Sequence, residues 1–89
     1  MKTSWGYLAT ANDTLAVATP NVGVYDITVG TGAASAVVTI YNGDSTSDPV
    51  AAVIDCATAR HVNLGGIRLS DGLFAKLTVG NAKVTISYR

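Results

Sequence analysis

A polar stretch in the middle of the chain, YNGDSTSDP at residues 41–49, has the residue types of a calcium loop. Side chains with oxygen ligands stand at alternate positions, namely Asn42, Asp44, Thr46 and Asp48. This is the spacing of the ligands at positions 1, 3, 5 and 7 of an EF-hand loop. The pattern then fails, because Ser47 stands where the loop needs glycine and Val53 where it needs a bidentate acid.

A second frame of the same loop begins at Asp44. It places Asp55 at the terminal acid position but Pro49 at the glycine position, and no flanking helices are predicted for either frame. A calcium site of different geometry, with ligands contributed partly by other loops, remains an alternative. Otherwise the stretch is a polar hairpin loop that turns at Asn42-Gly43, with Asp44 and Asp48 bonded to local amides. We therefore predict no metal site here.

Cys56 and His61 could form a nucleophilic pair, since they are five residues apart between two predicted strands. Such a pair needs direct contact and a third group that orients the imidazole. Cys56 continues the apolar face of residues 50–56 and is interpreted as a small core residue, with His61 exposed or at an interface. The glycine-rich GTGA at 30–33 precedes no helix that could hold phosphate. We predict that the protein is not an enzyme and has no cofactor.

Length and composition favour one domain, residues 1–89, that is stabilised by assembly. Charged residues make up 13% of the chain, and Glu and Gln are absent, whereas soluble domains carry roughly 25% charged residues. A single cysteine excludes an intrachain disulfide, and a chain of this length has only a modest core. These features are typical of a surface covered by other subunits, and we expect a homo-oligomer.

Other partners are disfavoured by the distribution of charge and apolar residues. The net charge is zero and the basic residues are scattered singly, so no basic face for nucleic acid is predicted. No apolar run reaches the ~20 residues of a membrane span, and the first residues lack the apolar run of a signal peptide. We expect a protein made in a cytosol that binds neither nucleic acid nor membrane.

The C-terminal segment LFAKLTVGNAKVTISYR has the clearest strand pattern. Gly80-Asn81 between two alternating runs is typical of a two-residue hairpin turn, which predicts that 73–79 pairs with 82–88. Residues 22–29 are predicted to form a second hairpin with 36–40. In it Ile27 pairs with Ala36, or with a residue two positions away, since a slip of two residues keeps the same faces; both Tyr25 and Ile27 face inward.

The strand at 50–56 is predicted to pair back onto 36–40 across the polar loop, with Val50 and Ile54 inward. Gly65-Gly66 interrupts the next apolar run and predicts a bulge or a corner. With a shorter strand at 14–18, the count is about six to eight short strands and no helix. The expected fold is therefore all-β, a small antiparallel β-sandwich or jelly roll.

The first residues show no clear pattern and are expected to form an extended N-terminal segment, with 1–13 as an arm or a short edge strand. Trp5 either covers one end of the core or inserts into a neighbouring subunit, and we favour the second role because Trp and Tyr are common interface anchors. Five residues are candidate contacts with other subunits or a partner: Trp5, Tyr7, Tyr41, Asp44 and Asp48.

The order ITVGTGAASAVVTIYNGDSTSDPVAAVI followed by GGIRLSDGLFAKLTVGNAKVTISYR resembles the small β-rich virion proteins of tailed bacteriophages. The matching pieces are Tyr41-Asn42-Gly43, Gly72-Leu73 and the terminal strand Val84 to Tyr88, within residues 24–89. These are strand and turn patterns, not a catalytic signature.

The resemblance implies a virion structural protein assembled in the host cytoplasm. Its expected role is capsid decoration or cement, which binds the assembled shell and stabilises contacts between capsomers. The implied partners are the major capsid protein or other virion proteins, and the implied oligomer is a trimer. The alternative is a receptor- or carbohydrate-binding module of a phage tail or head fibre, for which Tyr41 beside the polar loop is the candidate.

Overall fold

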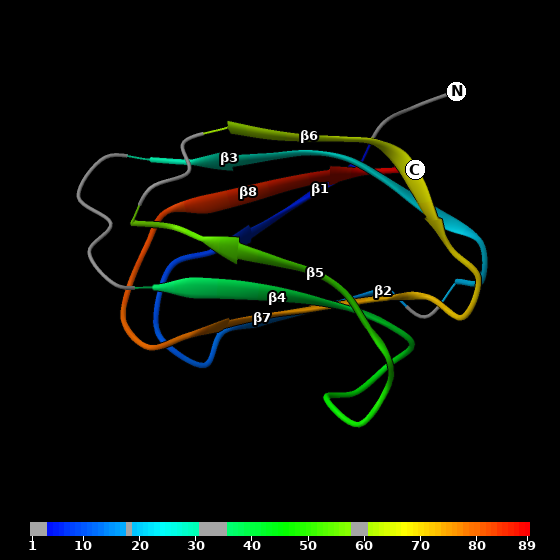
Figure 1. Cartoon of the computed structure of the whole chain (residues 1–89), viewed down its shortest axis with the longest axis horizontal. Coiled ribbons are helices and arrows are strands. Elements are labelled where there is room, and N and C mark those ends of the chain that lie inside the picture. The colour runs from blue at the N-terminus through cyan, green and yellow to red at the C-terminus, as the bar shows by residue number, and fades with distance from the viewer. Residues whose placement is uncertain (1–3, 18, 31–35, 58–60) are drawn as a thin grey trace.

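The structure is a computed structural model that describes residues 4–17, 19–30, 36–57 and 61–89. All the regular structure in these ranges is β-strand (Figure 1). The strands are β1 (Ser4–Leu8), β2 (Thr14–Val17), β3 (Val22–Val29), β4 (Val37–Asn42), β5 (Val50–Asp55), β6 (His61–Leu69), β7 (Leu73–Thr78) and β8 (Val84–Tyr88).

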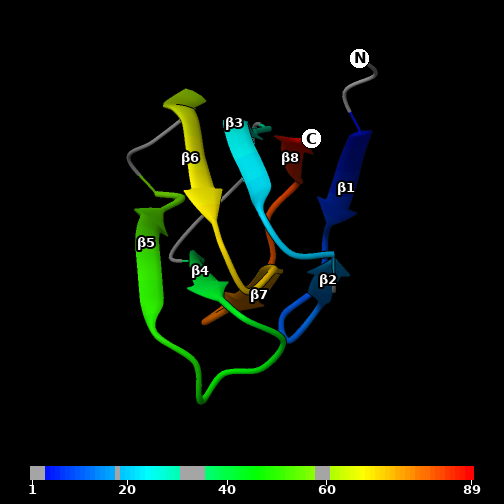
Figure 2. The ribbon, with the colours of Figure 1, turned by 90° about the vertical axis from the view of Figure 1, so that its right-hand side faces the viewer.

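The strands form two four-stranded antiparallel sheets stacked face to face. Sheet A has the order β1-β8-β3-β6 and sheet B the order β2-β7-β4-β5, and Figure 2 shows one sheet above the other. The pairs β1 with β8, β2 with β7, β3 with β6 and β4 with β5 are all antiparallel. This is the arrangement of a long hairpin that is rolled up, which defines a jelly roll. The predicted all-β sandwich is confirmed.

The core lies between the two sheets and is apolar. Alternate side chains of each strand point inward, as the two-residue period of a strand requires, and no polar or charged side chain is buried among the described residues. The fully buried larger side chains are Leu8, Val24, Ile27, Val38, Ile40, Cys56, Leu69, Leu73, Leu77, Val84 and Ile86.

The predicted hairpins of 73–79 with 82–88 and of 22–29 with 36–40 are both wrong, because in each case the two strands lie in different sheets. β7 lies in sheet B and β8 in sheet A, and β3 and β4 are likewise divided between the sheets. The turn after β7 contains Val79 at φ 64° and Gly80 at φ 129°, and Val79 is 67% exposed, not inward. Most inward positions on these strands are nevertheless predicted correctly, because two strands that face each other across a core show the same alternation as two strands paired in one sheet.

The predicted pairing of β5 with β4 across the polar loop is confirmed, with Ile40 opposite Ala52. The register shifts between Ile40 and Tyr41, so that Tyr41 lies opposite Val50. Val50 is therefore on the outer face and 56% exposed, which corrects its predicted inward position. The physical reason is the extra residue of a β-bulge, which reverses the alternation beyond it.

The predicted irregularity at the double glycine is also confirmed. β6 shifts register against β3 between Val24 and Asp26, and both Gly65 and Gly66 have positive φ. β3 also shifts against β8 between Val24 and Asp26, so that Tyr25 is an extra residue in β3. This places Val24 in the core and leaves Tyr25 half-buried, which corrects the predicted inward position of Tyr25. The Tyr25 ring instead lies beside Gly66 and 5.0 Å from the guanidinium carbon of Arg89.

Candidate functional site

The sandwich has two broad outer faces of different chemistry, one on each sheet. Residues directly opposite each other on neighbouring strands point to the same side of a sheet, so the register defines continuous rows of side chains. Leu8, Ile27 and Ile86 point into the core, and their neighbours along the strands therefore point outward. The outer faces are the best candidates for function, because they present ordered side chains on a rigid scaffold.

The outer face of sheet A carries two rows that cross all four strands, and we call their eight residues the polar face. The first row is Trp5, Ser87, Asp26 and Asn63. The second row is Tyr7, Thr85, Thr28 and His61. Aromatic rings thus stand at the β1 edge, and the remaining six residues bear hydrogen-bonding groups.

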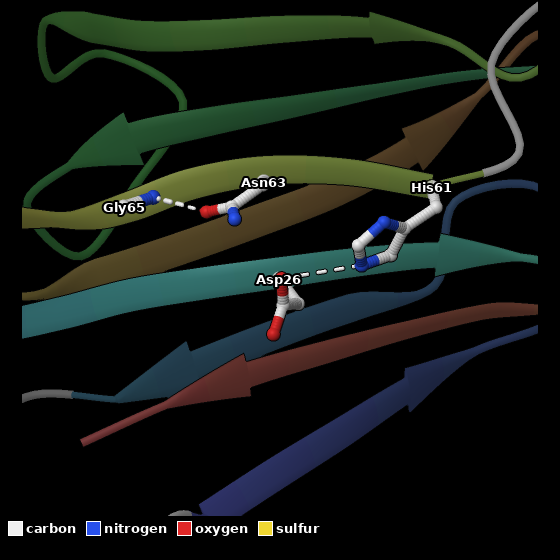
Figure 3. A network of polar contacts seen from close by, with 4 residues as sticks. All are labelled: Asp26, His61, Asn63 and Gly65. Atoms are coloured by element: carbon white, nitrogen blue, oxygen red, sulfur yellow. Dashed lines mark hydrogen bonds and ion pairs between the residues drawn. The ribbon is translucent and has the colours of Figure 1, made fainter.

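Asp26 and His61 join the two rows by a polar contact (Figure 3). Asp26 Oδ1 lies 3.2 Å from His61 Nε2, and the side chains are 43% and 58% exposed. Beside them the Asn63 carboxamide oxygen accepts a hydrogen bond of 2.8 Å from the Gly65 amide, which orients that side chain next to the bulge. These contacts hold polar groups in fixed positions while leaving them accessible to a ligand.

The aromatic edge of the polar face is well exposed. Trp5 is 68% exposed and Tyr7 50%, while the intervening Gly6 is buried. A Cβ at Gly6 would collide with the Leu15 side chain of β2, so the absence of a side chain there lets sheet B pack close to β1. Trp5 therefore does not cover an end of the core, which excludes the first of its two predicted roles.

The outer face of sheet B, which we call the apolar face, carries three rows. They are Ala16, Phe74, Tyr41 and Val50; then Thr14, Lys76, Thr39 and Val53; then Thr78, Val37 and Asp55. The rings of Tyr41 and Phe74 are in tilted contact with centroids 6.0 Å apart, and Val53 is 64% exposed. Lys76 and Asp55 supply the charge in these rows.

The loop between β4 and β5 projects beyond the sheets (Figure 1) and is organised by Asp48. Its carboxylate Oδ2 accepts hydrogen bonds from the amides of Asp44 at 2.8 Å and Ser45 at 3.0 Å. Gly43 lies against this carboxylate, since a Cβ there would overlap it. The loop is also tied to the turn after β6, because Asn42 Oδ1 accepts from the Asp71 amide at 2.8 Å. Asp48 is thus occupied in shaping the loop.

Asp13 performs the same role in the turn after β1. Its Oδ2 accepts from the amides of Thr10 at 2.9 Å and Ala9 at 3.0 Å. The Thr10 amide, followed by that of Ala9, lowers the pKa of Asp13 below its ordinary value. The Asp44 amide, followed by groups of Ser45, lowers the pKa of Asp48 in the same direction. Both turns therefore favour the ionised carboxylate.

We expect these two carboxylates to make the fold sensitive to acid. A group whose pKa is lowered by folding contributes stability that is complete above its unfolded pKa, near 3.8, and is lost as the pH falls through the lower folded value. The midpoint of thermal unfolding should thus fall when the pH is lowered from 6 to about 3. The double variant Asp13→Asn, Asp48→Asn should show a smaller fall, because its amides do not titrate. An equal fall in both proteins would contradict the assignment.

Cys56 and His61 are not brought together. Cys56 is fully buried, with its amide bonded to the Ala36 carbonyl at 2.9 Å, whereas His61 lies on the polar face against Asp26. Within the described ranges, no group of three or more His, Cys, Asp or Glu side chains is placed to hold a metal ion. The same ranges contain no helix that could span a membrane.

The five residues predicted as contacts lie on three separate parts of the surface. Trp5 and Tyr7 lie together on the polar face, Tyr41 lies on the apolar face, and Asp44 and Asp48 lie in the projecting loop. One flat partner therefore cannot touch all of them. Sequence reasoning missed the Asp26 and His61 contact, whose partners are separated by 35 residues. The alternation of Asp26 and Thr28 on the outer side of β3 was the available signal.

No protein-family model and no curated protein matches this sequence.

Proposed function

We propose that this protein is a virion structural protein of a tailed bacteriophage, a capsid decoration or cement protein. It binds the assembled shell and stabilises contacts between capsomers, with the major capsid protein or another virion protein as its partner and a trimer as its oligomer. The observation that carries the proposal is the apolar face of an eight-stranded jelly roll. Jelly rolls are common among viral capsid domains, although they also occur in lectins and cupins.

The apolar face has the composition of a docking surface. Val50 and Val53 expose more than half of their surface on edge strand β5, next to the tilted pair of Tyr41 and Phe74. Contiguous exposed apolar residues on a small protein mark an interaction surface. Aromatic residues in contact at the centre, with few charges around them, are typical of the anchors that dominate interface energies.

The scarcity of charge in the whole chain supports the same proposal. With 13% charged residues, the protein has little of the mixed surface charge that keeps free proteins soluble. Covering the apolar face in an assembly would remove the exposed side chains of Val50 and Val53 from water. A virion component made in the host cytoplasm meets its partner as the particle forms, so it need not persist as a free molecule at high concentration.

The number of copies per particle tests the proposed role. Quantitative mass spectrometry of purified virions of the phage that encodes this chain should find on the order of hundreds of copies, because a symmetric shell repeats its binding site many times. A dozen copies or fewer would overturn the shell assignment and favour the tail or fibre alternative.

Val53→Lys should weaken binding to shells that lack the protein by about 30-fold or more, because placing a charge in an apolar contact beside the Tyr41 and Phe74 pair costs roughly 2 kcal/mol or more. Val79→Lys is the matched control, since Val79 is equally exposed but lies in the turn beyond β7. Co-sedimentation with shells measures both variants, and circular dichroism checks that both fold. Equal binding by the two variants would show that the apolar face does not dock on the shell.

A further inference from the structure

The polar face lies on the opposite side of the sandwich from the proposed docking surface, and we propose that it binds neutral oligosaccharides. The inference does not depend on the decoration role, because it uses different residues on a different sheet. In a particle decorated through the apolar face, sheet A would point away from the shell. The two faces of one small domain then serve two partners.

The aromatic edge supplies a surface for the apolar side of a sugar ring. Trp5 and Tyr7 are two positions apart on β1 and point to the same side, so their Cα atoms are separated by about 6.6 Å. A pyranose ring has a face of C–H groups that packs on the electron-rich face of an aromatic ring. In the single chain, exposures of 68% and 50% leave both side chains available for such stacking.

The centre of the polar face supplies the hydrogen bonds. Ser87 and Thr85 lie directly opposite Trp5 and Tyr7, and Asp26 and Thr28 follow on the next strand. Hydroxyl groups both donate and accept, and a carboxylate accepts on two oxygens. A sugar stacked on the β1 edge would therefore place the hydroxyls on its rim over groups of complementary type.

The far side of the face is already oriented for binding. The 3.2 Å contact from His61 Nε2 to Asp26 Oδ1 fixes the direction of the carboxylate, and the Gly65 amide fixes the Asn63 carboxamide. Prior orientation lowers the entropic cost of binding. The rows span four strands, a width of about 14 Å, which suits a short oligosaccharide better than a single sugar.

Two other ligand classes fit the same residues less well. The eight positions of the polar face contain no Lys or Arg. Arg68 and Arg89 lie beyond them, opposite Gly23 on the same outer side of sheet A, and two cations are few for nucleic acid, which is held mainly by such groups. The buried centre of a protein interface is normally depleted of Asp and Ser, whereas Asp26 and Ser87 occupy the middle of this face. A neutral polyhydroxylated ligand matches both the aromatic edge and the polar centre.

The test is binding of the purified full chain to an array of neutral and anionic glycans, followed by isothermal titration of the strongest neutral ligand. Trp5→Ala and Asp26→Ala should each weaken the affinity by about tenfold or more, because one removes the stacking surface and the other a charged acceptor. Both residues are exposed enough for the variants to fold, which thermal unfolding verifies. Val53→Lys, on the opposite face, should bind the glycan unchanged.

Several outcomes would overturn the inference. These are no array signal above background, binding confined to anionic glycans and abolished by salt, or unchanged affinity in Trp5→Ala. Dissociation of an oligomer by Trp5→Ala, without glycan binding by the unmodified chain, would assign the face to a protein contact instead. Because Val53→Lys reports on shell docking and Trp5→Ala on glycan binding, failure of one proposal is distinguishable from failure of the other.

Discussion

Leu77→Ala is expected to lower the free energy of unfolding by about 2 to 5 kcal/mol, the usual cost of deleting a buried leucine side chain and leaving a cavity. Leu77 is completely buried and lies on β7, opposite Val38 of the central strand β4. It is also part of the hydrophobic cluster that the described residues form between the inner faces of both sheets. A cavity at this position is therefore enclosed by packed strands of both sheets, and such surroundings relax only partially.

The effect should be severe because the domain is small. Folded domains are stable by about 5 to 15 kcal/mol, and short chains lie at the lower end. The loss at Leu77 can thus remove a third or more of the total stability, enough to leave much of the variant unfolded at 37 °C.

Urea unfolding followed by circular dichroism measures this loss as a lower midpoint concentration with an unchanged slope. Val53→Ala is the matched control, since this residue is 64% exposed on β5, and its free energy of unfolding should change by no more than about 0.5 kcal/mol. Similar midpoints for Leu77→Ala and the unmodified chain would mean that the two inner faces do not pack as described.

Much of the core could be predicted from the sequence, because the alternation of apolar and polar residues identifies which side of a strand faces the core. Leu73, Leu77 and Ile86 were placed inward by this pattern, and all are buried. The same pattern could not say which strands share a sheet, since strands across the core from each other alternate like paired strands. The tight turn at Gly80 therefore suggested a hairpin where the chain in fact passes between sheets.

The arrangement of side chains on the two outer faces depends on which strands pair, and the sequence pattern does not reveal this. His61 reaches Asp26 because β6 pairs with β3. Trp5 lies in the same row as Asp26 because β1 pairs with β8 and β8 pairs with β3. These contacts join distant segments, so no local spacing in the sequence indicates them. Val50 shows a further limit, because a one-residue bulge turned it from the predicted inner side to the outer side. Bulges can be predicted where glycines mark them, but no glycine marks this one.

The glycine-marked bulge in β6 allows a sharper experiment. Gly66→Ala is expected to cost about 2 to 4 kcal/mol of stability, and Gly65→Ala only about 1 to 2 kcal/mol. Both glycines have left-handed backbones, with φ values of 81° and 64°. They differ in their surroundings. A Cβ at Gly66 would lie 2.7 Å from the Tyr25 ring, whereas a Cβ at Gly65 meets nothing within 4 Å.

The Tyr25 ring can be separated from backbone strain by a double-mutant cycle. If the collision with the ring causes the extra cost, Gly66→Ala in a Tyr25→Ala background should cost no more than Gly65→Ala does alone. Urea unfolding of the four proteins measures the coupling. An undiminished cost in the Tyr25→Ala background would assign the whole effect to the backbone of Gly66. The cycle also tests the bulge register, because Tyr25 lies beside Gly66 only when β3 shifts against β6 between Val24 and Asp26.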